Sequence, residues 1–167
     1  TRVVVPFQRL TEVEELVKDA MSSYRIGLSH DPRTDVGPLA NGDQHYRVTS
    51  QLDRAPLDGA RLVYSTERDE LPEHGYFVPA QAHMVIDTRI PLAQEEVFGP
   101  VLAILPYVNE HDALEIANGC SFGPEASVWS ADEERAVEVA GKIHVGAVDV
   151  NGALTGQAAL PAGDNRY

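Results

Sequence analysis

Two adjacent carboxylates, Glu95 and Glu96, precede Phe98 and a Gly-Pro pair in the stretch "QEEVFGPVLAIL", and a continuous apolar run follows at once. A carboxylate accepts hydrogen bonds from hydroxyl groups, and such charge-assisted bonds are among the strong ones. An aromatic ring beside it can exclude water and pack against a flat group. The stretch therefore allows two interpretations, a solvated turn ahead of a buried strand or a grip on a polar ligand that carries a planar ring.

Cys120 is the only cysteine, so no disulfide can form within the chain and a cysteine-based metal site is not expected. A lone thiol can act as a nucleophile when a base or a helix N-terminus activates it. Cys120 instead follows the predicted end of a helix in "IANG", where the helix dipole raises the pKa of a thiol. We predict a buried or idle cysteine.

The histidines offer no metal-binding pattern, because no two are four residues apart on a helix and HExxH is absent. The chain also lacks the GxSxG elbow of many hydrolases and the GxGxxG and Walker loops that hold phosphates. Its own residues therefore predict no complete catalytic set and no metal. The six histidines are His30, His45, His74, His83, His111 and His144.

Composition limits the partners of the chain. Its 167 residues are 43% apolar, which is typical of a globular fold, and its formal net charge of −13 disfavours nucleic acid and anionic lipid. No apolar run approaches the roughly 20 residues that cross a bilayer, and the N-terminus has no signal-peptide pattern, so we expect a cytoplasmic protein. The chain begins at Thr1 on a strand-like run without Met, as a piece of a longer protein would.

The elements that must position these residues follow from the hydrophobic pattern and the capping residues. Apolar runs predict strands, and segments of helical period predict helices. Capping boxes are expected at Thr11/Glu14 and Ser130/Glu133, and Asn109 is expected to be an N-cap. The strands are expected at 3–5, 60–65, 76–80, 83–87, 101–107, 125–130 and 146–151, and the helices at 10–24, 43–54, 91–94, 109–119 and 130–143.

From Val101 onward, strands alternate with helices, which predicts crossover connections and a parallel sheet. The expected fold class is therefore α/β, with a largely parallel sheet flanked by helices. Ligands of open parallel sheets bind at the carboxyl ends of the strands. Those ends are expected near Tyr107, near Ser130 and at Asn151.

Six stretches, in order, resemble the markers of the aldehyde dehydrogenase superfamily. "QEEVFGPV" is similar to the family's Glu-Glu-x-Phe-Gly-Pro-Val motif, and the other five fall at suitable spacing before and after it. They are "GPLA" (37–40), "GARLV" (59–63), "GYFVPA" (75–80), "ALEIANGCSFGPEASVWSAD" (113–132) and "VGAVDVNGA" (145–153). The resemblance implies that residues 1–153 are part of the catalytic domain, with an irregular tail at 154–167.

The resemblance assigns roles to four residues. It implies that Glu96 hydrogen-bonds the ribose hydroxyls beside nicotinamide, that Phe98 packs beside the nicotinamide ring, and that Asn151 and Ala153 border the aldehyde. Glu95 is then expected to be a structural or surface acid. The implied cofactor is NAD or NADP, the implied substrate is an aldehyde, and the implied product is a carboxylic acid.

In this family the nucleophilic cysteine would lie about four residues before Thr1, and the nucleotide-binding domain further upstream. We therefore expect the isolated chain to be inactive and to self-associate or form a homo-oligomer. The chain departs from the family pattern at Pro124, where leucine is usual, at Ala80, where threonine is common, and in the short "LPAGDNRY" ending. A non-catalytic relative, a CoA-acylating relative and an acyl-phosphate reductase remain alternatives.

Overall fold

The computed structural model describes residues 1–152, so Ala153 and the tail expected at 154–167 lie outside the described residues. The chain divides into a first unit, Thr1–Val108, and a second unit from Asn109 onward. No helix in the described part of the chain combines the length and apolar character needed to cross a membrane.

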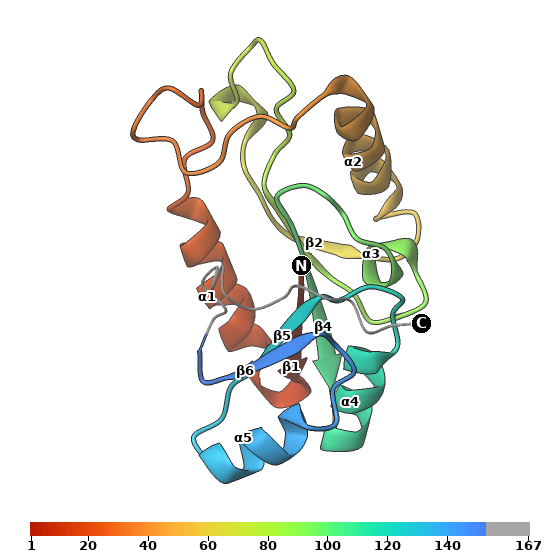
Figure 1. The fold of residues 1–167 in the computed structure, drawn as a ribbon. Coiled ribbons are helices and arrows are strands. Elements are labelled where there is room, and N and C mark those ends of the chain that lie inside the picture. The colour runs from red at the N-terminus through yellow and green to blue at the C-terminus, as the bar shows by residue number, and fades with distance from the viewer. Residues whose placement is uncertain (153–167) are drawn as a thin grey trace. The chain divides into compact units, whose positions relative to one another are not determined.

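The first unit is built on a four-stranded sheet in the order β1-β4-β3-β2 (Figure 1). The β1–β4 and β3–β4 pairs are parallel, and the β2–β3 pair is antiparallel. With its flanking helices, this largely parallel sheet confirms the expected α/β class. The strands are β1 (Arg2–Pro6), β2 (Arg61–Ser65), β3 (Gln81–Met84) and β4 (Val101–Tyr107). The helices are η1 (Phe7–Arg9), α1 (Leu10–Ser22), α2 (Gly42–Arg54), η2 (Arg68–Glu70) and α3 (Pro91–Gln94).

Helix α1 covers a core made by alternate residues of three strands, which are Val5, Ala82, Met84 and Ile104. Residues 13, 17 and 21 of α1 pack on this core because they are four residues apart and share one helical face. Leu16 and Ala20 are apolar and close to this face by helical period, but both are exposed in the structure.

Two of the three predicted caps are displaced. Helix α1 already begins at Leu10, so Thr11 lies inside its first turn, and Arg9 at the N-cap position makes no side-chain capping bond. Helix α5 (Glu133–Ala140) is capped by Asp132 rather than Ser130, through a bond from the Arg135 amide. Asn109 caps α4 (Glu110–Asn118) as predicted, accepting from the Asp112 amide at 3.0 Å.

Residues 76–80 are buried in part but form no strand, contrary to the sequence pattern. Pro79 has no amide hydrogen to donate to a ladder. The carbonyl oxygens of Tyr76 and Phe77 are engaged elsewhere, by the Leu39 amide at 2.9 Å and by His45 Nε2 at 3.2 Å. The segment is therefore an anchored loop that leads into β3.

The second unit contains α4, β5 (Glu125–Val128), α5 and β6 (Ala147–Val150). In its described part, β5 and β6 form a parallel pair. The expectation that every strand from Val101 onward shares one sheet is wrong, because β4 pairs with β1 and β3. Both edges of β4 are thereby occupied, which leaves no ladder position for β5.

His83 gives the first unit a pH-dependent stability. Its side chain is 1% exposed, and its Nε2 lies 2.9 Å from Gln81 Oε1. Burial lowers the pKa of His83 below the ordinary value of 6.5, because the interior disfavours the imidazolium ion. The unfolded chain therefore binds the proton more readily, so the stabilisation is complete above pH 6.5 and is lost as the pH falls through the folded-state pKa.

We expect the melting temperature of the chain to be lower at pH 5.5 than at pH 7.5, by about 2–4 °C for each 1 kcal/mol lost. The His83→Gln variant, which carries no titrating group at this position, should show a smaller difference between the two pH values. Differential scanning calorimetry of both proteins checks this. If both proteins showed the same difference in melting temperature between the two pH values, a group other than His83 would cause the pH dependence.

Candidate functional site

The segment from Glu95 to Pro100 joins α3 to β4 and presents two side chains outward. Val97 is 7% exposed and anchors the segment in the core, while Phe98 is 64% exposed and Glu96 is also exposed. Among the described residues, none donates a hydrogen bond to the Glu96 carboxylate. The segment thus offers a carboxylate acceptor and an aromatic ring on either side of a buried anchor.

The turn that follows is tightly bonded to the sheet. The Gly99 amide donates to the Val97 carbonyl at 2.7 Å, and the Val101 amide donates to the Gly99 carbonyl at 2.8 Å. The Pro100 carbonyl accepts from the Gln81 amide, which opens β3, at 3.0 Å. These bonds fix the position at which the segment enters β4.

The amino end of β1 lies beside this segment. Thr1 donates its N–H to the Val101 carbonyl at 3.3 Å, and the Glu96 carboxylate attracts the Thr1 amino group. Burial lowers the pKa of that amino group below 8.0 and outweighs the opposing effect of Glu96. Glu96 and the beginning of β1 are therefore electrostatic neighbours.

Sequence reasoning missed the contribution of α2 to this site. Gln44 donates from Nε2 to the Phe98 carbonyl, and Gln51 donates from Nε2 to Glu95 Oε2 at 3.1 Å. The spacing of Gln44 and Gln51 indicates that they share a face of α2, since residues seven apart lie near one side of a helix. Nothing in the local pattern showed what that face contacts.

Asn151 lies in the second unit, at the end of β6. Its φ of 51° is left-handed, a conformation that asparagine adopts more readily than most residues. Its backbone amide donates to the Val128 carbonyl at 2.9 Å, and its Oδ1 accepts from the Ser130 amide at 2.8 Å. The structure thus places Glu96 and Phe98 in one segment and gives Asn151 a local role between the ends of β5 and β6.

Cys120 is buried, as predicted, and its Sγ lies 2.9 Å from the Phe122 carbonyl. Within residues 1–152, no group of three or more His, Cys, Asp and Glu side chains is arranged to hold a metal ion.

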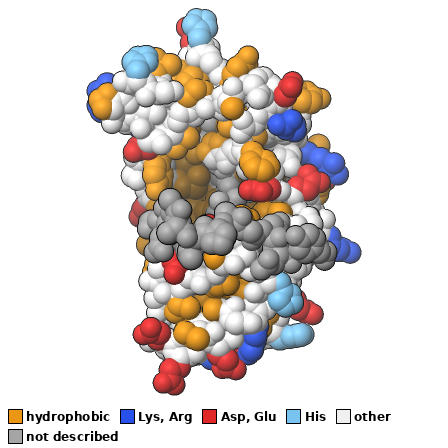
Figure 2. Space-filling model, viewed as in Figure 1, with side chains coloured by type: hydrophobic (Ala, Val, Ile, Leu, Met, Phe, Trp, Pro, Cys, Tyr) orange, Lys and Arg blue, Asp and Glu red, His pale blue; other side chains and the backbone are white. Residues whose placement is uncertain are grey.

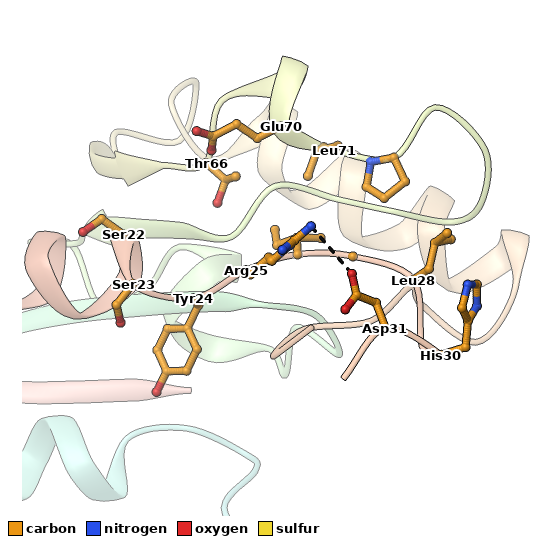
Figure 3. A pocket seen from close by; sticks show the side chains of 13 residues that line it. Ser22, Ser23, Tyr24, Arg25, Leu28, His30, Asp31, Thr66, Glu70 and Leu71 are labelled. Atoms are coloured by element: carbon orange, nitrogen blue, oxygen red, sulfur yellow. Dashed lines mark ion pairs between the residues drawn. The ribbon is translucent and has the colours of Figure 1, made fainter. Parts of the chain in front are cut away.

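A cavity of about 560 Å³ lies in the first unit, between the end of α1 with the loop after it and the 66–72 loop (Figure 3). None of its lining residues belongs to the 95–100 segment. Arg25 lines the cavity, and its guanidinium group lies 3.6 Å from the Asp31 carboxylate. Arg33 binds the same carboxylate at 2.9 Å. Arg33 lowers the pKa of Asp31 to about 2, so this carboxylate stays ionised and neutralises the cation.

A family model for the aldehyde dehydrogenase family matches residues 1–165. The chain belongs to this family. It is 36% identical to the 3-succinoylsemialdehyde-pyridine dehydrogenase of a Pseudomonas species, over 92% of this chain and 32% of the relative. It is also 36% identical to the geranial dehydrogenase of Castellaniella defragrans, over 91% of this chain and 31% of the relative. The chain therefore spans about a third of the length of these curated aldehyde dehydrogenases.

Solved aldehyde dehydrogenase structures share its fold. The Mycobacterium tuberculosis aldehyde dehydrogenase, complexed with NAD+, matches with a TM-score of 0.88 and 32% identity, over 99% of this chain and 35% of that one. Aldehyde dehydrogenase C of Pseudomonas syringae, complexed with NAD+ and octanal, matches with a TM-score of 0.86 and 33% identity, over 92% and 32%. The succinic semialdehyde dehydrogenase of Streptococcus pyogenes, complexed with NADP+, matches with a TM-score of 0.89 and 29% identity, over 98% and 35%.

Proposed function

We propose that this chain is part of an NAD(P)-dependent aldehyde dehydrogenase that oxidises an aldehyde to a carboxylic acid, and that Glu96 and Phe98 receive the cofactor. The observation that carries the proposal is the exposed pair around the buried Val97. A carboxylate that accepts no hydrogen bond from the described residues can accept bonds from two ribose hydroxyls, and the exposed ring can pack beside nicotinamide. The NAD+ and NADP+ bound in related structures support this assignment.

The bound cofactor would supply the oxidant, and this chain would supply its position. Glu96 would hold the ribose by accepting hydrogen bonds, and Phe98 would restrict the plane of the ring and exclude water from it. Proximity and orientation account for a large part of enzymatic rate enhancement. Residues that position the cofactor in this way would therefore affect the reaction rate.

The strand register supports the same site. Arg2 lies opposite Ala103, and the offset is unchanged up to Pro6, which lies opposite Tyr107. The amino end of β1 therefore lies level with the beginning of β4, next to the segment that carries Glu96 and Phe98. A nucleophile about four residues before Thr1, as the family resemblance implies, would stand on the chain that leads into this end of β1.

The family resemblance assigns the aldehyde contact to Asn151 and Ala153, and the geometry within the second unit suits the first of these. The Asn151 Oδ1 is occupied by the Ser130 amide, which fixes the side-chain amide and leaves Nδ2 as a donor. An N–H donor suits the carbonyl oxygen of an aldehyde. This assignment rests on the family resemblance together with that orientation.

One experiment tests the proposal on two proteins. The first is a chimaeric dehydrogenase in which residues 1–167 replace the corresponding third of the M. tuberculosis enzyme, and we expect it to form NADH from NAD+ and an aldehyde. The second is the isolated 167-residue chain, for which we expect no aldehyde-dependent NADH formation. A folded but inactive chimaera would contradict the proposal.

The isolated chain should also self-associate in light scattering. Acidic side chains are spread over the face seen in Figure 2, but hydrophobic side chains reach the same surface. Several are large, and groups of this kind drive association. The large hydrophobic side chains that the structure leaves exposed include Phe7, Leu57, Ile86 and Trp129. Activity of the isolated chain that Cys120→Ser abolished would contradict both the assigned role of the chain and the idle role of Cys120.

A further inference from the structure

Three asparagines of this chain are followed directly by glycine, at Asn41, Asn118 and Asn151. An Asn-Gly pair can lose its side-chain amide without an enzyme, because the backbone nitrogen of the glycine attacks the side-chain carbonyl carbon. Glycine favours this attack, since it has no Cβ to shield its nitrogen or to restrict the backbone. Which of the three pairs reacts in the folded chain depends on the backbone at each asparagine and on what holds its side chain.

Asn41 has a backbone that permits the attack. It is exposed, and its φ of −160° and ψ of 173° are those of extended backbone. In extended backbone the following nitrogen is gauche to Cβ, so a rotation about the Cα–C bond brings it to the side-chain carbonyl carbon. Gly42 is the first residue of α2, where an amide has no intrahelical acceptor, and none of the described residues accepts a hydrogen bond from it. This nitrogen is therefore available as a nucleophile.

The side-chain amide of Asn41 is held in a way that favours the same reaction. Its Oδ1 accepts from the Gln44 amide at 2.9 Å. This donor would stabilise the negative charge that develops on the oxygen when the nitrogen adds to Cγ. The Nδ2 atom, which is the leaving group, donates to no residue within 1–152. The carbonyl is thus polarised while the leaving group is free to depart into water.

Asn118 is a matched contrast, because alanine precedes it and glycine follows it, as at Asn41. It is the last residue of α4, and both ends of its side-chain amide are engaged. Its Nδ2 donates to the Lys142 carbonyl at 2.9 Å, and its Oδ1 accepts from the His144 amide at 2.8 Å. The amide of the following glycine donates into the last turn of the helix at 3.4 Å. Nucleophile, carbonyl and leaving group are all held in place, so the fold protects this pair.

Asn151 is protected by a different conformation. Its φ of 51° is left-handed, and in that region the following nitrogen is anti to Cβ, far from the side-chain carbonyl carbon. Its Oδ1 is also held by the Ser130 amide at 2.8 Å. The attack would require the backbone to turn over and this bond to break.

We propose that the pair formed by Asn41 and Gly42 is a deamidation site of the folded chain. Hydroxide removes the Gly42 amide proton as water, the nitrogen bonds to Cγ of Asn41, and the Cγ–Nδ2 bond breaks. Nδ2 takes a proton from water and leaves as ammonia, which regenerates the hydroxide. Water then adds to either carbonyl carbon of the resulting succinimide and opens the ring to aspartate or isoaspartate. No cofactor, substrate or oxidant takes part.

The first test compares the three pairs within one protein. The full 167-residue chain is incubated in mildly alkaline buffer, with and without urea, and peptide mass spectrometry measures conversion at each asparagine. Without urea, Asn41 should convert about tenfold faster than Asn118 or Asn151, because misplaced reacting groups lose rate steeply. In urea, Asn41 and Asn118 should convert at similar rates, since the residues on either side of them are the same.

Gly42→Ala tests the route of the reaction. A Cβ at position 42 would lie 3.4 Å from Cε1 of Tyr76, an ordinary contact, and alanine suits a helix better than glycine. The variant should therefore fold, and its methyl group should shield the attacking nitrogen. We expect conversion at Asn41 to slow about tenfold, with Asn118 unchanged.

Equal conversion of Asn41 and Asn118 without urea would overturn the inference. So would an intact Asn41 in a chain that converts only in urea, because the capping bond to Gln44 would then hold the side chain away from the Gly42 nitrogen. Undiminished conversion in Gly42→Ala would mean that water attacks the side-chain amide directly, and the succinimide route would be wrong.

Discussion

In the chimaeric dehydrogenase, Glu96→Gln is expected to slow single-turnover NADH formation about 100-fold with little change in melting temperature. The amide keeps the shape of the side chain but loses the charge that strengthens two hydrogen bonds to ribose hydroxyls. Bonds to charged groups contribute about 1.5–3 kcal/mol each. A displacement of the reacting ring by about 1 Å costs on the order of 100-fold in rate. Because Glu96 is exposed, the fold has little to lose from the substitution.

Glu95→Gln is the matched control, with the same chemistry one residue earlier. Glu95 is engaged by Gln51 through Oε2, and an amide still offers an oxygen to that donor. We therefore expect a change in rate of no more than about twofold. If Glu95→Gln proved equally or more damaging, the assignment of the ribose contact to Glu96 would be wrong by one residue.

Gly75→Ala is expected to destabilise the chain by about 3 kcal/mol, the sum of backbone strain and overpacking. Gly75 has a φ of +124°, which side-chain-bearing residues rarely adopt. Its Cβ would also lie 2.6 Å from Cε2 of Phe77, a buried ring that packs with Ile26 and Ala80. Thermal unfolding should show a fall of about 6–12 °C.

Gly59→Ala separates the two causes. Gly59 has a φ of +96°, but a Cβ there would meet nothing within 4 Å. It should therefore show the strain alone, about 1 kcal/mol. Equal effects at the two glycines would mean that the Phe77 ring moves aside freely, and the packing argument would fail.

Gly59 and Gly75 give a physical reason for two of the sequence markers on which the family resemblance was based. Gly59 opens the "GARLV" marker and Gly75 opens "GYFVPA", so two markers of the family resemblance begin at positive φ. The continuous apolar run at 101–107 also predicted β4, because a strand that is buried on both faces shows no alternation of apolar and polar residues. Asn109 was predictable because its cap depends on neighbours three residues away.

Other features depend on partners distant in sequence. The partners of β4 are set by which strand edges are available, and the order of elements from Val101 onward does not contain that information. The capping boxes failed because Thr-x-x-Glu and Ser-x-x-Glu also occur where a helix begins elsewhere. In α1, Glu14 pairs instead with Arg61 of β2.

In the candidate site, too, some features could be predicted from the sequence and others depend on partners distant in sequence. Residue type alone left Glu95 and Glu96 equivalent, both being exposed acids, and the resemblance separated them. The contacts of α2 then gave a physical distinction, since Gln51 engages only the first. No local pattern at residues 44–51 could have indicated a partner about fifty positions away.

The pairing of β1 with β4 has a consequence for biosynthesis. Arg2 lies opposite Ala103, so β1 waits for about a hundred residues to be made before its partner strand leaves the ribosome. Closure of so long a loop must come late in folding, and sheets dominated by such distant pairings form slowly. Until then, an apolar strand with unpaired backbone groups is open to other chains. The 95–99 segment enters β4 directly, so the start of β1 comes to lie beside it only when that pairing forms.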